Sequence, residues 1–252
     1  MKVLIVIPAR YASTRFPGKP LALLGGETVI SRVWHRVRQA QGVADVVVAT
    51  DDERIFNHVV SFGGKGAAMM TSDTHRSGTD RCGEVAQRLE AEGKHYDVVV
   101  NVQGDEPFIE PEQIEKLIDC FNRPDVAIGT LVTRFTSIDE LLSPNNAKVV
   151  AANDGSALYF SRQAIPYRRG VDVSKWLERN IYLKHVGIYA FRSDVLHEVC
   201  RLQPSVLEEC EMLEQLRWLA AGYRIQLCQT EHSNVGIDTP EDLAEAEAKL
   251  KR

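Results

Sequence analysis

The sequence lacks the features of membrane, secreted and nucleic-acid-binding proteins. Its first apolar run, residues 3–7, stops at Pro8 and is too short for the core of a signal peptide, and no later run is long enough to span a membrane. Positive charge is not in excess, because 30 Lys and Arg stand against 35 Asp and Glu for a net charge of −5. No internal repeat or low-complexity tract is present. We therefore expect one large cytoplasmic domain, residues 1–252, without nucleic-acid partners or membrane insertion.

The cysteines are few, scattered and odd in number. None of the five shows the spacing of a metal site, and an odd number argues against a complete disulfide framework. We expect reduced core residues in a cytoplasmic protein, with a catalytic thiol as the weaker alternative. The five are Cys82, Cys120, Cys200, Cys210 and Cys228.

Strand-like and helical patterns alternate through the first half of the chain. Strands are expected at residues 3–7, 46–49, 98–102 and 126–133, and helices at 29–41, at 84–92 and from 111 onward. This alternation predicts an α/β fold with a doubly wound, mostly parallel sheet. Three strand-like runs without intervening helices, at 148–152, 157–160 and 182–191, predict a small β-rich elaboration over about 145–190 that carries an oligomer contact.

The last quarter of the chain returns to helical patterns. Residues 206–221 predict one helix ended by Gly222, and residues 224–228 predict a final strand. Thr239 as N-cap and Pro240 at the first helical position predict the start of a C-terminal helix.

The loop after the first strand concentrates positive charge in an otherwise acidic protein. Residues 8–20 carry Arg10, Arg15 and Lys19 and no acidic residue. Loops at the carboxyl ends of strands bind ligands in open α/β sheets, and cations among small residues suit a polyphosphate. The alternative is a solvated basic turn, since Pro17 and Gly18 form a turn in any case.

Two distant acidic motifs complement this loop. Asp105 follows the Val-rich strand at 98–102, and Asp238 stands before the better helix cap Thr239. Carboxylates that face a polyphosphate require a cation between them, and Mg²⁺ held by one or two carboxylates plus phosphate oxygens is the default. The alternative is that Asp105 or Glu106 merely caps a turn.

Three further polar groups have both a functional and a structural interpretation. Ser77, Gly78 and Thr79 either contact a nucleotide or cap a helix. His185 in its strand is more often structural than functional. Glu211 and Gln215 share a helix face that is either solvated or in contact with a ligand.

Taken together, these motifs resemble the 3-deoxy-manno-octulosonate (KDO) cytidylyltransferase family over nearly the whole chain. The resemblance rests on IPARYASTRFPGKPL at 7–21, NVQGDEP at 101–107, ALYFSR at 157–162, KHVGIYAFR at 184–192, EMLEQLR at 211–217 and GIDTPEDL at 236–243. It implies a nucleotide-diphospho-sugar transferase-like fold and the reaction CTP + KDO → CMP-KDO + pyrophosphate, which activates KDO for lipopolysaccharide synthesis. It also implies a homodimer.

The resemblance also implies roles for particular residues. Lys19, Arg10, Asp105 and Asp238 would be catalytic, with Asp105 and Asp238 as ligands of Mg²⁺. The nucleotide would be held by Ala9, Arg10, Ser13, Arg15, Lys19, His75, Ser77, Gly78, Arg81 and Gln103. The sugar pocket would be lined by Tyr159, Arg162, His185, Tyr189, Glu211 and Gln215.

Three other functions remain open at the level of sequence. The same reaction on 8-amino-3,8-dideoxy-octulosonate differs by one functional group. A glycosyltransferase that uses a nucleotide sugar has a similar half-domain, although residues 51–53 resemble acids of a first helical turn more than its metal motif. A non-catalytic nucleotide-binding regulator would not need Lys19, Asp105 and Asp238 together.

Overall fold

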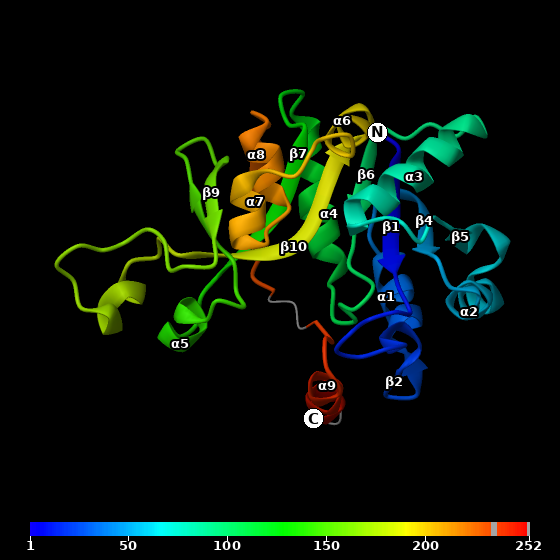
Figure 1. Cartoon of the computed structure of the whole chain (residues 1–252), viewed down its shortest axis with the longest axis horizontal. Coiled ribbons are helices and arrows are strands. Elements are labelled where there is room, and N and C mark those ends of the chain that lie inside the picture. Colours follow the sequence, from blue (N-terminus) through cyan, green and yellow to red (C-terminus); the bar gives the residue numbers. More distant parts are fainter. Residues whose placement is uncertain (233–235, 251–252) are drawn as a thin grey trace.

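The computed structural model describes residues 1–232 and 236–250. In this part of the chain a nine-stranded sheet has the order β11-β7-β10-β6-β1-β4-β5, with β8 and β9 attached beside β10 (Figure 1). The nine strands are β1 (Val3–Ala9), β4 (Val43–Thr50), β5 (Ala68–Met70), β6 (Val98–Asn101), β7 (Ile128–Arg134), β8 (Lys148–Ala151), β9 (Ala157–Ser161), β10 (Leu183–Arg192) and β11 (Ile225–Gln229). The short strands β2 (Leu23–Leu24) and β3 (Glu27–Thr28) form a separate pair.

The strand directions confirm the predicted α/β class. Strand β1 runs parallel to β4 and β6, β4 parallel to β5, and β7 parallel to β11. Strand β10 is antiparallel to both β6 and β7. The sheet is therefore mixed but mostly parallel around β1, and the carboxyl ends of β1, β4 and β6 meet at one edge.

Helices cover both faces of the sheet because the buried strand β1 alternates its apolar side chains between them. Val3, Ile5 and Ile7 belong to the cluster under α1, α2 and α4, whereas Leu4 and Val6 belong to the cluster under α3, α6 and α8. The α-helices are α1 (Val29–Val37), α2 (Glu53–Gly63), α3 (Gly78–Ala91), α4 (Pro111–Asp119), α5 (Ile138–Leu142), α6 (Ser193–Val199), α7 (Val206–Glu211), α8 (Gln215–Ala220) and α9 (Pro240–Leu250).

The prediction of one helix over 206–221 is wrong. The segment forms α7 and α8, separated by Met212 in the left-handed conformation with φ of 51°. Helix α7 buries no residue, whereas α8 buries Gln215, Leu216 and Trp218. Because of this break, α8 packs against the core and α7 does not. The continuous apolar pattern of the sequence does not reveal this difference.

Other boundaries also shift. Helix α3 begins six residues before the predicted 84–92 helix, because Ser77 and Asp80 form a capping box that starts it at Gly78. Helix α1 ends at Val37 rather than near Gln41. Asp52 caps α2 by accepting a hydrogen bond from the backbone N–H of Arg54 at 2.9 Å, so the 51–53 acids do mark a helix start.

The β-rich segment has a small core of its own. Phe135, Leu141, Trp176 and Tyr182 pack together, and the rings of Trp176 and Tyr182 stack at 5.7 Å. Figure 1 shows β9 and the following connection extending away from the helices around β1. The last part of the predicted 145–190 elaboration belongs instead to β10, which crosses the centre of the main sheet.

The cysteines are unpaired, and one of them is not in the core. Cys82 is buried and Cys120, Cys200 and Cys228 are partly buried, but Cys210 is exposed, so its assignment as a core residue is wrong. Among the described residues, no helix is both long and apolar enough to cross a membrane.

Candidate functional site: a charged cavity at the carboxyl edge of the sheet

A cavity of about 430 Å³ opens at the carboxyl ends of β1 and β6. Four segments enclose it, namely the loop after β1, the start of α3, the loop after β6 and the segment before α9. Its lining residues are Pro8, Ala9, Arg10, Ala12, Ser13, Thr14, Arg15, Lys19, Pro20, Arg76, Ser77, Gly78, Gln103, Gly104, Asp105 and Asp238. Eight of the ten residues predicted to hold the nucleotide are among them.

The loop after β1 is held in a compact turn around one carbonyl. The Tyr11 oxygen accepts the backbone N–H groups of Ser13 at 3.0 Å and Gly18 at 2.9 Å. Gly18 has a φ of 73°, in the left-handed region where a side chain is strained. The turn returns the chain so that Arg10, Arg15 and Lys19 all line one cavity.

The loop after β6 approaches β1 closely. A Cβ atom on Gly104 would lie 2.7 Å from the carbonyl oxygen of Pro8, so only glycine fits without movement of the backbone. This approach brings Asp105 against the basic loop.

Lys19 joins the two aspartates. Its Nζ bonds to Asp105 Oδ2 and lies 3.0 Å from Asp238 Oδ1, and Arg15 lies 3.0 Å from Asp238 Oδ2. Burial alone would lower the pKa of Lys19, but the charges and hydrogen bonds of Asp105 and Asp238 raise it above its ordinary value. Lys19 is therefore a permanent cation at the meeting point of two carboxylates 133 residues apart in the chain.

The backbone explains how the two aspartates meet. Ile237 donates its N–H to the carbonyl of Asp105 at 2.8 Å, and its side chain is buried in a cluster with Leu24, Val29 and Ala246. Thr239 accepts the N–H of Asp242 at 3.2 Å, so Thr239 is the cap of α9. The Asp238 carboxylate is left to face the cavity, as the sequence predicts.

The start of α3 forms another wall of the cavity. Ser77 accepts the N–H of Asp80 at 3.1 Å and thereby caps the helix. Ser77 and Gly78 also line the cavity, so both interpretations of this loop hold at once.

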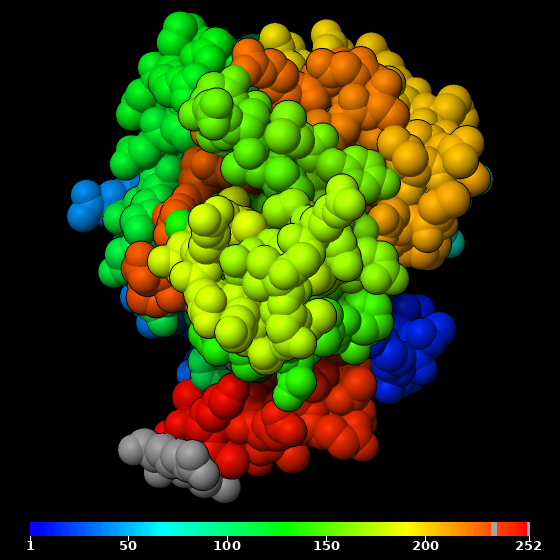
Figure 2. All heavy atoms as spheres, turned by 90° about the vertical axis from the view of Figure 1, so that its left-hand side faces the viewer, coloured from blue at the N-terminus to red at the C-terminus, as the bar shows by residue number. Residues whose placement is uncertain are grey.

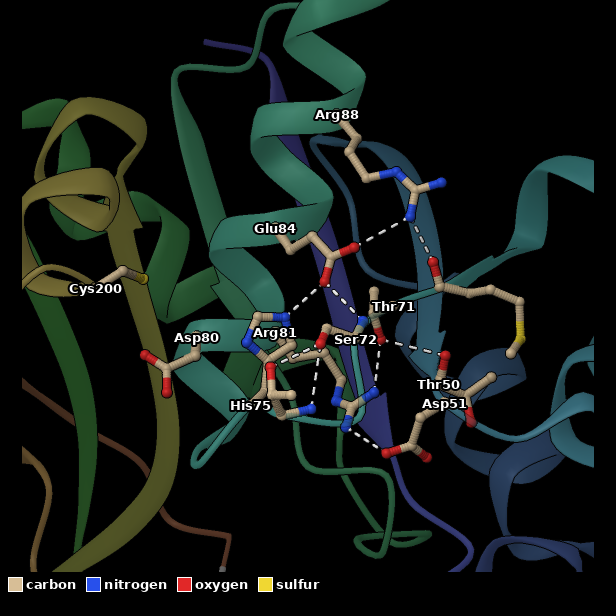
Figure 3. A network of polar contacts seen from close by, with 12 residues as sticks. Thr50, Asp51, Thr71, Ser72, His75, Asp80, Arg81, Glu84, Arg88 and Cys200 are labelled. Carbon is tan, nitrogen blue, oxygen red and sulfur yellow. Dashed lines mark hydrogen bonds and ion pairs between the residues drawn. The ribbon is translucent and has the colours of Figure 1, made fainter.

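His75 and Arg81, both predicted to hold the nucleotide, do not line the cavity. Figure 3 shows the polar contacts that they make instead. Arg81 is fully buried and donates to Thr71 at 2.6 Å and to Asp51 at 2.7 Å. His75 Nε2 lies 2.6 Å from Glu84. Both side chains make contacts that fasten the loop 71–77 to β4 and α3 beside the cavity, and their contact with a nucleotide stays a prediction.

The residues predicted for the sugar lie together on β9, β10, α7 and α8, beside the cavity rather than in it. His185 packs against Phe160 at 5.2 Å and Tyr189 at 5.3 Å between ring centroids. Gln103, a cavity residue, donates to the carbonyl of Gly187 on the same strand at 3.4 Å. This bond connects the cavity to β10.

His185 is neutral in this setting. Burial lowers the pKa of its ring to about 3. The Thr130 hydroxyl, which lies 3.0 Å from His185 Nε2, donates to the carbonyl of Ile188 at 2.8 Å. Thr130 therefore accepts from the histidine, which makes the ring a hydrogen-bond donor through Nε2.

Arg162 and Glu211 satisfy each other and the backbone. Glu211 accepts the Ser161 hydroxyl at 2.7 Å and the Arg162 N–H at 2.9 Å. The Arg162 guanidinium donates to the carbonyls of Pro144, Glu211 and Met212, so three of its five N–H donors are used by the fold. Tyr159 is partly exposed on the neighbouring strand β9.

Gln215, unlike Arg162 and Glu211, has a side-chain polar atom without a hydrogen-bond partner among the described residues. The residue is buried, and the atom is its amide nitrogen. An unmatched buried donor is costly unless something else satisfies it.

A metal at the cavity would need ligands besides the protein. Within residues 1–232 and 236–250, no three His, Cys, Asp or Glu side chains gather in a way that would hold an ion. Asp105 and Asp238 provide oxygen donors that already share one cation, the Lys19 ammonium. Carboxylates completed by phosphate oxygens match the preference of Mg²⁺.

Sequence reasoning missed residues that shape the site. Asp51 pairs with Arg81, and Gly104 permits the close approach of two loops. Gly104 lies inside the motif at 101–107 that supports the family resemblance, so the sequence could have indicated that a glycine is required there. The Asp51–Arg81 pair had none, because its members are 30 residues apart with no shared pattern.

Comparison with known proteins identifies similar chains. A family model described as cytidylyltransferase matches residues 4–225. The 3-deoxy-manno-octulosonate cytidylyltransferases of Parabacteroides distasonis and Geobacter sulfurreducens are 51% and 45% identical, with alignments covering 99% and 100% of this chain and 98% and 100% of theirs.

Solved structures give the same result at high identity and the fold at low identity. A structure of CMP:2-keto-3-deoxy-manno-octonic acid synthetase complexed with CTP is 43% identical, with a TM-score of 0.90 over 100% of this chain and 99% of that one. A 4-diphosphocytidyl-2C-methyl-D-erythritol synthase from Anaerococcus prevotii is 16% identical with a TM-score of 0.63, over 100% of this chain and 97% of that one.

Proposed function

The chain belongs to the 3-deoxy-manno-octulosonate cytidylyltransferase family, and we propose from this premise that it converts CTP and KDO to CMP-KDO and pyrophosphate. It is an enzyme of the nucleotidyltransferase class. The observation that carries the proposal is the convergence of Lys19, Asp105 and Asp238 in a cavity that also holds Arg10 and Arg15.

The basic loop suits the triphosphate of CTP. Arg10 lines the cavity without a hydrogen bond or ion pair to any described residue, and Arg15 is 64% exposed. Lys19 stays charged because the pKa of its ammonium is raised. Three cations at one wall can neutralise the charge that grows on the non-bridging oxygens and on the departing pyrophosphate.

The sugar supplies the nucleophile. Its anomeric hydroxyl forms a bond to the α-phosphorus of CTP as the bond from that phosphorus to the pyrophosphate oxygen breaks. The hydroxyl proton passes to solvent water and the negative charge passes to pyrophosphate. Gln103 is well placed to align the two substrates. It lines the nucleotide cavity and bonds to β10, where His185 and Tyr189 lie.

Asp105 and Asp238 would hold Mg²⁺ together with phosphate oxygens. The ion, when bound, supplies a Lewis acid that neutralises the phosphates. The fit is chemical, since hard oxygen donors from two segments already converge on one positive charge.

The sugar would be bound beside the nucleotide. The unpartnered amide nitrogen of Gln215 is a donor suited to hydroxyl and carboxylate oxygens. The neutral His185 ring, whose N–H is donated to Thr130, would offer its Nδ1 as an acceptor for a sugar hydroxyl. Arg162 would act by fixing the α7–α8 junction, since its guanidinium bonds to three carbonyls.

The face of the β-rich segment would form a homodimer. Exposed apolar side chains lie on this segment and on α7, and Figure 2 shows the segment spread over one face of the molecule. Exposed apolar side chains concentrated on one segment favour an interface with a second copy of the chain. These side chains are Leu158, Tyr167, Ile181, Val206 and Met212.

The proposal also covers where the enzyme works and what its product is used for. CTP and unpaired cysteines fit a cytoplasmic enzyme, and CMP-KDO would be the activated donor for lipopolysaccharide synthesis.

A pyrophosphate-release assay tests the proposed function. The wild-type chain is incubated with each of the four nucleoside triphosphates and with KDO, its 8-amino analogue or sialic acid. We expect release with CTP and KDO and little with the other pairs. Faster turnover of the 8-amino sugar would reassign the substrate, and CTP binding without release from any sugar would favour a regulator.

A further inference from the structure

Glu214 stands between the two groups of residues that the proposed function assigns to nucleotide and sugar. It immediately precedes α8, and its Oε2 accepts the Thr79 hydroxyl at 2.9 Å. Glu214 therefore attaches the junction of α7 and α8 to the first turn of α3, 135 residues away in the chain.

One side of this contact is the wall of the nucleotide cavity. Thr79 is buried, and the two residues before it, Ser77 and Gly78, line the cavity. Ser77 Oγ accepts the N–H of Asp80 at 3.1 Å and caps the helix, so Thr79 lies in the first turn that this cap starts. A shift of Glu214 would therefore shift the cavity wall.

The other side of the contact is the proposed sugar region. Gln215 directly follows Glu214, and Glu211, three residues before it, bonds to Ser161 and Arg162. Trp218 of α8 packs edge-on against Tyr189 at 4.9 Å. Met212, in the left-handed conformation, forms the bend within this short segment.

Burial disfavours the charged form of the Glu214 carboxyl. Burial therefore raises the pKa of Glu214, while the hydrogen bond from Thr79 opposes the rise. Among the described residues the Glu214 carboxyl forms no salt bridge, so the hydrogen bond from the Thr79 hydroxyl is what holds it in place.

We propose that Glu214 is a positioning residue that couples the two substrate sites. It would hold the α3 cavity wall and the α7–α8 junction in one arrangement, so that binding of either substrate favours binding of the other. The inference rests on the proposed function. By linkage the coupling is reciprocal, and a factor of about five or more is typical of such coupling between sites.

The test is an initial-velocity matrix over CTP and KDO concentrations. In the wild-type enzyme, saturating KDO should lower the KM for CTP about fivefold, and saturating CTP should also lower the KM for KDO. Thr79→Val removes the hydroxyl at constant shape and should abolish this dependence. Thr79→Ser keeps the hydroxyl and should restore it.

A second pair of variants separates coupling from stability. Glu214→Leu should behave like Thr79→Val, and the double variant should lose no more coupling than either single one. Glu208→Gln is the matched control, because Glu208 pairs with Arg217 across α7 and α8 at 2.5 Å without contact to the nucleotide wall. It should lower the melting temperature and leave the coupling intact.

The outcomes distinguish the two proposals. If wild type releases pyrophosphate but Thr79→Val keeps the full dependence, or Glu208→Gln loses it equally, the role of Glu214 is wrong and the proposed function stands. If wild type releases none with CTP and KDO, the proposed function fails and the role of Glu214 falls with it. If Glu214→Leu does not fold, the two Thr79 variants decide.

Discussion

The carboxyl edge around Lys19 and the polar region on β9, β10 and α8 use charge in opposite ways. At the carboxyl edge, Lys19, Asp105, Asp238 and Arg15 form ion pairs that remain in contact with a cavity. In the second region, Glu211 and Arg162 bond to each other and to the backbone, and His185 is neutral.

This difference indicates that the carboxyl edge acts electrostatically, whereas the region on β9, β10 and α8 positions groups. Charges that face a cavity can respond to the charge that grows on a phosphate during reaction. Polar groups that satisfy each other fix the shape of the fold and leave few donors, such as the Gln215 amide, for a ligand. Substitutions at the carboxyl edge should therefore alter turnover, whereas those in the supporting networks should alter stability or its pH dependence.

The largest effect is expected from removing charge at the carboxyl edge. Asp105→Asn or Asp238→Asn should lower kcat by about 100-fold or more, because each loses a charge that would organise the metal and Lys19. Pyrophosphate release checks this, with circular dichroism for the fold. Asp45→Asn, at a residue that bonds to Tyr96 away from the cavity, is the control. Near-normal kcat in both variants would reject the two-aspartate site.

A supporting network should respond in stability instead. Asp51→Asn leaves the fully buried Arg81 without its anionic partner and should lower the free energy of unfolding by about 3 kcal/mol. Urea denaturation measures it. Asp52→Asn should change little, because asparagine is also a good N-cap. If the two variants are equally stable, the Arg81 network does not hold the loop.

The neutral histidine predicts a pH effect on stability. The pKa of His185 is about 3 in the folded protein, against about 6.5 in the unfolded chain. Between these values the unfolded chain binds the extra proton, so the contribution is complete above pH 6.5 and is lost as pH falls toward 3. His185→Gln should flatten the slope of unfolding free energy over this range. An unchanged slope would mean that the ring already takes up its proton when folded.

The smallest effect is expected at the exposed cysteine. Cys210→Ser should change the free energy of unfolding by less than about 0.5 kcal/mol, since Cys210 is exposed. Cys82→Ser places a hydroxyl in the buried cluster under α3 and should cost about 1 to 3 kcal/mol. Thermal melts compare the two, and a larger loss at Cys210 would point to a packed environment there.

The sequence was informative where local pattern and tertiary demand agree. The apolar alternation of β1, the basic loop and the Thr239 cap each carry their own signal, and the structure has them where expected. The sequence failed where distant contacts decide. The bend at Met212 depends on which face meets the core, and the burial of Arg81 depends on Asp51. Neither the bend nor the ion pair produces a periodic pattern in the sequence.

The most direct test of the central claim measures metal binding rather than turnover. Mn²⁺, a spectroscopic substitute for Mg²⁺, is titrated by electron paramagnetic resonance into wild type, Asp105→Asn and Asp238→Asn in the presence of CTP. We expect wild type to bind Mn²⁺ with CTP and each variant to bind it at least about tenfold more weakly. Equal Mn²⁺ binding by all three proteins would contradict a shared site at Asp105 and Asp238.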